Sequence, residues 1–258
     1  MESVNLLKRK KALITGAGKG IGRAAGLAFA ANGADVSLVS RTAREVEELA
    51  AEIRKNFGVK AISLVADVSN NQEARAVVEK TETALGSIDA LICAAGYPFV
   101  KELWEKKILD LQDDDFLKIF QVDALGSFRV IKSALPGMMQ RRNGVIIIFS
   151  STPALSGYEK GGAYTLAKAA NLGLAKEIAA EYGSYNIRAY AIAPGNIRTI
   201  RTFDQLTSEE QEKLSTESPM KRWGNPEEVA NVAVTLASDN MSFVTGQTIV
   251  VDGGTVML

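Results

Sequence analysis

Short, mostly apolar runs recur along the chain, and longer stretches with polar and apolar residues at helical spacing lie between them. Each run is bounded by Gly, Asp, Ser or another polar residue, which is typical of strands that are buried on both faces of a sheet. The pattern predicts seven strands, at positions 12–14, 36–39, 61–66, 90–95, 145–149, 187–193 and 248–251.

Capping signals mark the ends of several predicted helices. Gly33 and Gly86 each follow an amphipathic stretch and predict a helix end. Ser69 precedes a third stretch and predicts a helix start. The segment Asn-Pro-Glu-Glu at 225–228 predicts a further start, because it combines a cap, a proline at the first helical position and an acid at the third. Besides the helix that starts at 225–228, helices are expected over 21–32, 43–56, 70–85 and 163–182.

Strands and helices alternate along the whole chain, which implies a parallel sheet with helices on both faces. Because no linker or low-complexity segment divides the chain, we expect one domain over residues 1–258. Two stretches, at about 97–115 and 196–222, are too long for simple strand–helix connections. Both leave strands at the edge where α/β proteins bind ligands, so we expect them to wall the substrate site. The alternative is that they are ordinary surface loops.

The composition excludes several classes of function. The 258 residues include 30 Lys plus Arg and 30 Asp plus Glu, so no basic excess points to a nucleic acid or a membrane surface. The chain has no histidine and one cysteine, Cys93, which rules out a Ser-His-Asp triad, a Cys-His dyad and a His-ligated metal site. No run of about 18 apolar residues occurs. We therefore expect a cytoplasmic protein with no metal, membrane or nucleic-acid partner.

The strongest chemical signal is a glycine-rich segment between the first predicted strand and the first predicted helix. It reads Thr-Gly-Ala-Gly-Lys-Gly-Ile-Gly over 15–22. Glycines let a backbone approach a pyrophosphate, and a helix N-terminus offers N–H groups to the anion. The segment predicts a dinucleotide site in a Rossmann-type, doubly wound α/β sheet of about seven parallel strands. Its candidate contacts are Gly16, Gly18, Lys19, Gly20, Ile21 and Gly22.

The Gly-x3-Gly-x-Gly spacing resembles the glycine loop of the short-chain dehydrogenase/reductase family. The resemblance extends over nearly the whole chain and ends with Gly246 and the Asp-Gly-Gly of 252–254. Ser151, Tyr164 and Lys168 match the family's active-site Ser and Tyr-x3-Lys. The further cofactor contacts that the resemblance implies are Asp67, Val68, Ala94, Ala95, Gly96, Tyr164, Lys168, Pro194, Gly195, Ile197 and Thr199.

The end of the second predicted strand bears on the choice between NAD and NADP. An acid there would bind the ribose 2′-OH of NAD, but this chain has Ser40 and Arg41. The planar guanidinium of Arg41 suits a 2′-phosphate, and Lys19 adds a second positive charge. In the family such a basic pair goes with NADP, so we predict NADP. The alternative is that Arg41 is a solvated surface residue and that Lys19 is incidental.

Tyr164 and Lys168 are four residues apart, so on a helix they share one face. A free tyrosine has a pKa of about 10, and a neighbouring ammonium favours its phenolate. The resemblance implies that Tyr164 is the acid/base, that Lys168 also holds the nicotinamide ribose and that Ser151 binds the substrate oxygen. The implied reaction is hydride transfer between NADP(H) and a carbonyl or secondary alcohol. The alternative is an exposed aromatic beside a surface lysine.

Several residues depart from the family pattern. Asp123 stands where the family commonly has an asparagine that helps to hold a water in a proton relay through Lys168. It is therefore a candidate catalytic residue, which either pairs with Lys168 as a tolerated near-isostere or lowers the activity and changes its pH profile. Tyr190 stands where an asparagine often precedes the Pro-Gly segment. Cys93 and Ala94 replace two asparagines, and we expect Cys93 to be a small buried apolar residue.

The substrate and the assembly are suggested only by the resemblance. The fatty-acid-synthesis ketoreductases, which act on 3-oxoacyl groups of a carrier protein, are the nearest broad comparison. Pro136 and Tyr185 stand where those enzymes carry basic residues for the carrier, so a sugar, a steroid-like or cyclic alcohol, or a small ketone fits equally well. A capping box at Thr207 and Glu210 predicts a short helix in the second wall segment. Helices around 115–140 and 163–182 resemble those of the family's homotetramers.

Two other functions stay open on the same fold. One is a non-catalytic NADP(H)-binding sensor or scaffold, for which Asp123 and Tyr190 leave room. The other is an epimerase or an enoyl reductase. Related enoyl reductases usually space the tyrosine and lysine more widely, so the Tyr164-x3-Lys168 spacing disfavours that alternative.

Overall fold

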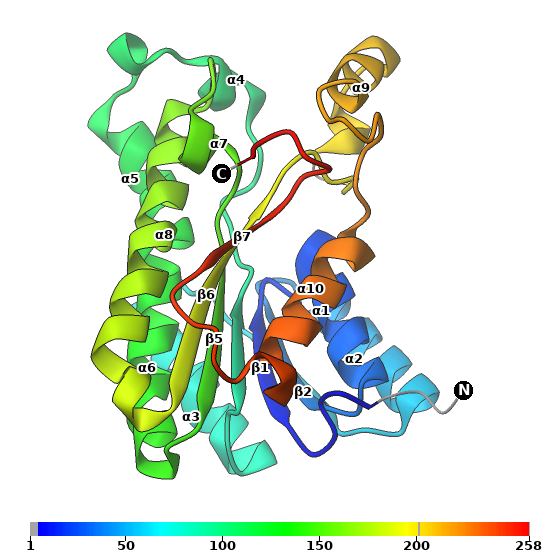
Figure 1. The fold of residues 1–258 in the computed structure, drawn as a ribbon, viewed down its shortest axis with the longest axis vertical. Coiled ribbons are helices and arrows are strands. Elements are labelled where there is room, and N and C mark those ends of the chain that lie inside the picture. The colour runs from blue at the N-terminus through cyan, green and yellow to red at the C-terminus, as the bar shows by residue number, and fades with distance from the viewer. Residues whose placement is uncertain (1–4, 201, 258) are drawn as a thin grey trace.

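Seven parallel strands form one sheet in the computed structural model, which describes residues 5–200 and 202–257 (Figure 1). The strand order is β3-β2-β1-β4-β5-β6-β7, and each neighbouring pair runs parallel. The predicted doubly wound α/β sheet is therefore confirmed. The strands are β1 Lys11–Thr15, β2 Asp35–Ser40, β3 Ala61–Val65, β4 Ala90–Cys93, β5 Gly144–Phe149, β6 Ile187–Pro194 and β7 Thr248–Val251.

Helices cover both faces of the sheet, because successive residues of a strand point to opposite sides and both sets are apolar. Ala12 and Ile14 of β1 face a core shared with α1, α2 and α10, whereas Leu13 faces a core shared with α3, α6 and α8. Figure 1 shows the first set on the right of the sheet and the second on the left. The bounds are α1 Gly20–Ala31, α2 Ala43–Phe57, α3 Asn71–Leu85, α6 Leu125–Arg141, α8 Gly162–Tyr182 and α10 Pro226–Ala237.

The sheet changes its direction of growth between β1 and β4. From β1 the chain adds β2 and β3 on one side, and it then returns to add β4 on the other. The loops that leave β1 and β4 diverge at their carboxyl ends, which is where ligands bind in such sheets. The other described helices are α4 Lys101–Glu105, η1 Ile108–Asp110, α5 Asp113–Asp123, α7 Pro153–Ser156, η2 Gly183–Tyr185, η3 Phe203–Gln205, α9 Ser208–Ser215 and η4 Asp239–Met241.

Several predicted helix ends are confirmed by the capping contacts. Asn225 forms a capping box at the start of α10, and Thr207 forms one at the start of α9. Gly86 is the left-handed C-cap of α3. The cap of α1 is Asn32, and Gly33 follows it with φ of +88°. None of the described helices has the length and apolar character needed to cross a bilayer.

Three local predictions are wrong. Asn70, and not Ser69, caps α3, because its side chain accepts hydrogen bonds from the two backbone N–H groups of Gln72 and Glu73. The helical stretch around 115–140 is divided, since α5 ends at Asp123 and α6 begins two residues later. The fourth strand ends at Cys93 instead of continuing to 95, because the chain leaves the sheet at that point to line the site.

Candidate active site

One cavity of about 480 Å³ opens at the carboxyl edge of the sheet, and it brings all of the candidate site residues together. They come from the segments that leave the carboxyl ends of β1 to β6 and from helices α1, α5 and α8. Their individual roles stay predictions. The candidates that line the cavity are Gly16, Gly18, Lys19, Gly20, Ile21, Gly22, Ser40, Arg41, Asp67, Val68, Ala94, Ala95, Gly96, Asp123, Ser151, Tyr164, Lys168, Pro194, Gly195, Ile197 and Thr199.

The glycine loop between β1 and α1 is shaped by positions that accept no side chain. Gly16 has φ of +68°, and a Cβ there would lie 2.5 Å from the backbone oxygen of Ala94. A Cβ on Gly22 would collide with the backbone oxygen of Gly16. Helix α1 starts at Gly20, and its N-cap residue Lys19 makes no side-chain capping bond. The first N–H groups of this helix and the narrow loop therefore fit the pyrophosphate of a dinucleotide.

Three charged side chains gather beside this loop, where α2 begins. Lys19 Nζ lies 3.0 Å from Oε1 of Glu45, and Ser40 Oγ donates to Oε2 at 3.1 Å. Arg41 is exposed and lines the same end of the cavity. The sequence pattern did not point to Glu45, because the expected position for an acid was the end of β2. Its place in the first turn of α2, which starts at the same edge of the sheet, was the signal that could have found it.

Asp67 and Val68 follow β3 and form the adjoining wall. The Asp67 carboxylate accepts the backbone N–H of Ser69 at 2.9 Å and its hydroxyl at 2.7 Å. Val68 is buried and packs closely on Gly126. A Cβ on Gly126 would lie 2.7 Å from Cγ2 of Val68. These contacts hold the backbone at the place that the family resemblance assigns to the adenine.

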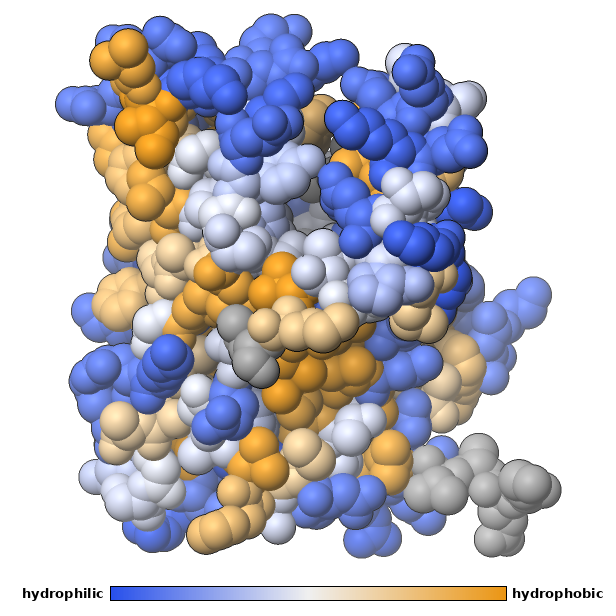
Figure 2. All heavy atoms as spheres, turned by 45° about the horizontal axis from the view of Figure 1, so that its top comes forward, coloured by the Kyte–Doolittle hydropathy of each residue, from blue (hydrophilic) through white to orange (hydrophobic). Residues whose placement is uncertain are grey.

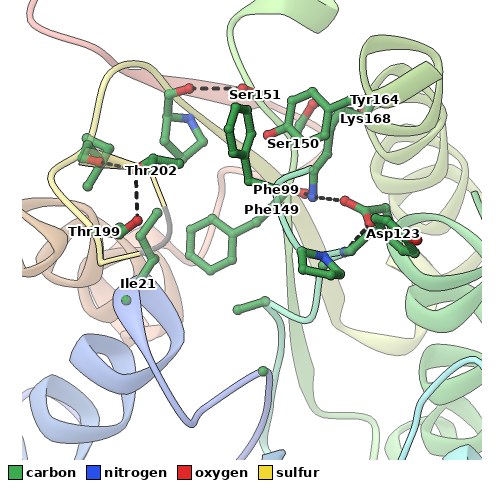
Figure 3. Close-up of a pocket in the computed structure, with 18 of the residues that line it drawn as sticks. Ile21, Phe99, Asp123, Phe149, Ser150, Ser151, Tyr164, Lys168, Thr199 and Thr202 are labelled. Atoms are coloured by element: carbon green, nitrogen blue, oxygen red, sulfur yellow. Dashed lines mark hydrogen bonds and ion pairs between the residues drawn. The ribbon is translucent and has the colours of Figure 1, made fainter. Parts of the chain in front are cut away.

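A buried ion pair lies at the opposite end of the cavity (Figure 3). Tyr164 and Lys168 lie one turn apart on α8, and Lys168 Nζ is 2.8 Å from Asp123 Oδ1. The two charged side chains are only 8% and 1% exposed. Burial lowers the pKa of Lys168, but Asp123 and Tyr164 outweigh it, so the pKa is raised and the ammonium persists. The suggested pairing of Asp123 with Lys168 is present in the structure.

Asp123 faces donors with both of its carboxylate oxygens. Oδ1 faces the Lys168 ammonium, and Oδ2 accepts the backbone N–H of Tyr97 at 2.6 Å. An asparagine here would have only one acceptor atom, and its NH2 group would face another donor. The ion pair at Oδ1 and the hydrogen bond at Oδ2 therefore account for a carboxylate at this position, and its effect on activity stays a prediction.

Asn171 is a buried residue that the sequence reasoning missed. Its Nδ2 donates to the backbone oxygens of Asp123 at 3.1 Å and Phe149 at 3.2 Å. Lys168 Nζ donates to the same Phe149 oxygen at 3.2 Å, and Ser150 Oγ donates to the Lys168 oxygen at 2.8 Å. An amide side chain one turn after Lys168 on an alanine-rich helix was the available signal. These bonds fasten α8 to α5 and β5, which positions the Lys168 ammonium.

Ser151 lies just beyond the end of β5, on the same side of the cavity as Tyr164 and Lys168 (Figure 3). Its hydroxyl donates to the Pro194 oxygen over a long 3.4 Å, which leaves it available to bind another oxygen. Figure 3 shows Ile21, Thr199 and Thr202 on the opposite side. The cavity therefore separates a hydroxyl–phenol–ammonium wall from Ile21 of the glycine loop and from Thr199 and Thr202.

An aromatic wall adjoins Tyr164. The Trp104 ring centroid lies 5.6 Å from that of Tyr164, 5.9 Å from that of Phe99 and 6.1 Å from that of Tyr158. Gly161, which precedes α8, has φ of +72° and would place a Cβ against the Trp104 ring. The Gly161 N–H donates to the Trp104 oxygen at 2.7 Å. Both segments predicted to wall the site line the cavity, and that they bind substrate stays a prediction.

Two of the departures from the family pattern lie outside the cavity. Tyr190 is fully buried, and its hydroxyl donates to the Val244 oxygen and accepts from Arg188 at 2.9 Å. Cys93 is 2% exposed, and burial raises its pKa to about 12, so it stays a thiol. Neither residue is among the described ones that line the cavity. Their identity therefore does not argue against catalysis.

Known proteins match the chain over nearly its whole length. The model of the family described as enoyl-(acyl carrier protein) reductase matches residues 16–256. The 3-oxoacyl-[acyl-carrier-protein] reductase FabG of Thermotoga maritima is 36% identical over 251 residues, which are 97% of this chain and 99% of that protein. The chain belongs to the short-chain dehydrogenase/reductase family.

Solved structures of such enzymes have the same fold. The crystal structure of a 3-oxoacyl-[acyl-carrier protein] reductase from Brucella melitensis matches with a TM-score of 0.92 at 33% identity, covering 98% of this chain and 94% of that one. Another structure of such a reductase from Brucella melitensis, with bound NAD, matches with a TM-score of 0.89 at 33% identity over the same shares of the two chains. The family likeness thus extends from the motifs to the whole architecture.

This short-chain dehydrogenase/reductase is an oxidoreductase that transfers hydride between a nicotinamide cofactor and a carbonyl or secondary alcohol. It is a divergent member, similar to the 3-oxoacyl-[acyl-carrier-protein] reductases. Family membership favours the enzyme over a non-catalytic sensor or scaffold. The match to a model described as an enoyl reductase does not change the Tyr164-x3-Lys168 spacing, which resembles that of carbonyl reductases.

Proposed function

We propose that this enzyme interconverts an apolar carbonyl compound and its secondary alcohol with NADP(H). Tyr164 is the acid/base, Ser151 binds the reacting oxygen and Lys168 favours the phenolate. The observation that carries the proposal is the shared cavity, in which these three side chains lie opposite a loop where Gly16 and Gly22 leave no room for a side chain (Figure 3).

The protein moves a proton while the substrate gains or loses a hydride. When bound, the nicotinamide cofactor supplies or accepts that hydride. In reduction, the Ser151 hydroxyl donates to the carbonyl oxygen, and Tyr164 gives its phenolic proton to that oxygen. In oxidation, the Tyr164 phenolate takes the alcohol proton. Lys168 Nζ lies 5.6 Å from the Tyr164 ring centroid, from where its charge favours the phenolate, and Asp123 partly offsets that charge.

The basic residues beside the glycine loop support NADP over NAD. Arg41 is exposed at the rim, where its guanidinium can make paired bonds to a phosphate. Lys19 and Ser40 lie at the same end of the cavity. The relative with bound NAD shows that the fold also accepts the cofactor without a 2′-phosphate.

The wall beside Tyr164 supports an apolar substrate. Trp104 packs on the proposed acid/base, and Phe99 and Tyr158 pack on Trp104, so a ring or alkyl group can be buried beside this wall. A 3-oxoacyl group on a carrier protein is a second candidate, favoured by the names of the relatives. Pro136 lies inside α6 and Tyr185 in η2, at the places where the carrier's basic partners are expected, and neither side chain is charged.

We propose a cytoplasmic homotetramer, as the family resemblance implies. Leu117, Phe128 and Leu166 expose 44–53% of their surface on α5, α6 and α8. The edge strand β7 is only partly buried, and Figure 2 shows hydrophobic side chains gathered near the centre of the face that it crosses. Apolar patches of this kind are typical of subunit interfaces. Light scattering coupled to size exclusion would contradict the tetramer if the protein ran as a monomer.

Steady-state turnover followed by nicotinamide absorbance tests the function. NADPH is combined with ring ketones, aldehydes, keto acids and a 3-oxoacyl thioester, and NADP⁺ with sugars and cyclic alcohols. Every assay is repeated with NADH or NAD⁺ and with Tyr164→Phe. We expect turnover of the apolar ketones with NADPH and a loss of about 10²–10⁴-fold in Tyr164→Phe. Undiminished turnover in that variant would contradict the assigned acid/base.

A further inference from the structure

The Lys19–Glu45 pair stands where the proposed function places the 2′-phosphate of NADP. Glu45 Oε1 lies 3.0 Å from Lys19 Nζ, and Oε2 accepts from Ser40 Oγ at 3.1 Å. Oε2 also lies against Gly18, so a Cβ there would collide with it. The Glu45 side chain is 17% exposed. An anionic group of this protein is therefore already bound by the loop.

A 2′-phosphate would need the same partners. Ammonium, hydroxyl and guanidinium groups bind carboxylates and phosphates in the same way, through charge-assisted hydrogen bonds. Lys19, Ser40 and Arg41 all line this end of the cavity. Two anions that share these donors at such short range repel each other. A ribose 2′-OH behaves differently, because it is neutral and can donate a hydrogen bond to a carboxylate.

We propose that Glu45 sets the cofactor selectivity of this enzyme by competing with the 2′-phosphate of NADP for Lys19 and Ser40. The proposal rests on the NADP site proposed above. Binding of NADP requires the Glu45 side chain to leave Lys19, whereas binding of NAD does not. Glu45 thus weakens NADP binding and Arg41 strengthens it, and the balance between these two residues decides the preference.

A purely structural Glu45 makes a different prediction. If the carboxylate only held Lys19 and the loop in shape, its loss would weaken both cofactors by the same factor. The discriminating quantity is therefore the ratio of the two dissociation constants. It is measured on binding alone, without turnover.

The experiment compares Glu45→Gln with Glu48→Gln. Glu48 lies one turn further along α2, pairs with Arg44 at 2.7 Å and is not among the described residues that line the cavity. Both variants remove one negative charge from the same helix. Titration calorimetry on the full-length proteins gives the dissociation constants of NADPH and NADH at low and high salt. Adenosine 2′,5′-bisphosphate and AMP repeat the comparison without the nicotinamide.

We expect Glu45→Gln to tighten NADPH and the bisphosphate about tenfold, which corresponds to about 1.4 kcal/mol. NADH and AMP should change by less than about twofold, because they carry no 2′-phosphate. The gain should shrink at high salt, since it is electrostatic. Glu48→Gln should leave all four constants unchanged. An unchanged NADH/NADPH ratio in Glu45→Gln, or an equal change in Glu48→Gln, overturns the proposal; Glu45→Ala serves as a second variant.

The two proposals fail in different ways. The wild-type ratio tests the NADP assignment, and the change of that ratio in Glu45→Gln tests the role of Glu45. A wild type that prefers NADH and shifts toward NADPH in the variant would refute the first and support the second. A wild type that prefers NADPH, with the same ratio of dissociation constants as the variant, would support the NADP assignment and refute the role of Glu45.

Discussion

A lysine–carboxylate pair lies at each end of the cavity, and the two pairs differ far more in burial than in geometry. Lys19 and Glu45 are 3.0 Å apart, with side chains that are 44% and 17% exposed. Lys168 and Asp123 are 2.8 Å apart, with side chains that are 8% and 1% exposed. A pair with one exposed partner contributes about 1 kcal/mol, whereas removing one partner of a buried pair costs about 3–5 kcal/mol. Because water reaches the Lys19–Glu45 pair, a ligand can separate it at a small cost. The buried Lys168–Asp123 pair cannot be separated in this way.

The surroundings of the two pairs differ accordingly. Glu45 comes from the first turn of a helix at the rim, and Lys19 from a loop. Asp123 ends α5, and Lys168 lies inside α8, where Asn171 ties the two helices together. The chemical groups are alike, so the comparison can be tested by changing one partner at a time.

The largest effect is expected from Lys168→Met, because it leaves the Asp123 carboxylate buried without a cation. We expect the melting temperature to fall by roughly 6–20 °C, from about 3–5 kcal/mol at 2–4 °C each. Turnover should fall at least about 100-fold. Scanning calorimetry and steady-state assays measure the two effects. The double variant Lys168→Met/Asp123→Asn should regain most of the stability and none of the turnover; an unaltered melting temperature in the single variant would refute the cost of burial.

Asp123→Asn sharpens the comparison by removing the negative charge and keeping the shape. The amide cannot accept from both Lys168 and Tyr97, so we expect a loss of about 1–3 kcal/mol in the free energy of unfolding. Asp123 is one of the groups that raise the pKa of Lys168, so its neutralisation should lower that pKa and move the alkaline midpoint of the pH–rate profile to lower pH. A merely structural residue would lower stability and leave that midpoint in place.

Arg41→Ala tests the exposed end, where the expected effect is on a ligand and not on the fold. The loss of a charge-assisted contact of about 1.5–3 kcal/mol should weaken NADPH binding at least about tenfold. NADH binding and the melting temperature should be little changed. Arg44→Ala is the matched control, since Arg44 is exposed and pairs with Glu48. Equal weakening of both cofactors by Arg41→Ala would contradict the NADP assignment.

Glu228→Gln calibrates the comparison with an ion pair far from any proposed chemistry. Glu228 binds Arg222 and caps α10, which lowers its pKa to about 2. Because that value lies below the unfolded value of about 4.3, the carboxylate stabilises the fold above about pH 4.3 and loses this effect as the pH falls toward 2. At neutral pH we expect the variant to lose about 1 kcal/mol or less in urea unfolding. Glu227→Gln, in the same turn, is the control; an equal loss there would refute the specific contact.

The regular part of this molecule could be predicted from local pattern. Strands buried on both faces must be apolar at successive positions, so their runs stand out, and the glycine loop is required by sterics at Gly16 and Gly22. The ends of elements were less certain. Ser69 and Asn70 are both good caps, and only the path of the chain decides that Asn70 meets the first N–H groups of α3.

The contacts that modify the chemistry could not be predicted in the same way. Glu45 and Asn171 act through partners that are distant in sequence or on another element, and neither belongs to a recognisable motif. Tyr190 illustrates the opposite error, because a departure from the family pattern drew attention to a residue that points into a core. Spacing identifies which residues share a helix face, but three-dimensional packing decides which of them meet.

The contact between Trp104 and Gly161 joins the substrate wall to the start of α8. The backbone oxygen of Trp104 accepts a hydrogen bond from the Gly161 N–H. The Trp104 ring fills the space where a side chain at Gly161 would lie. A molecule that presses on the indole therefore also strains the turn that carries Tyr164, three residues further on. Substrates that fit this wall poorly should then show a lower kcat as well as weaker binding. The enzyme would discriminate between substrates through the alignment of its acid/base.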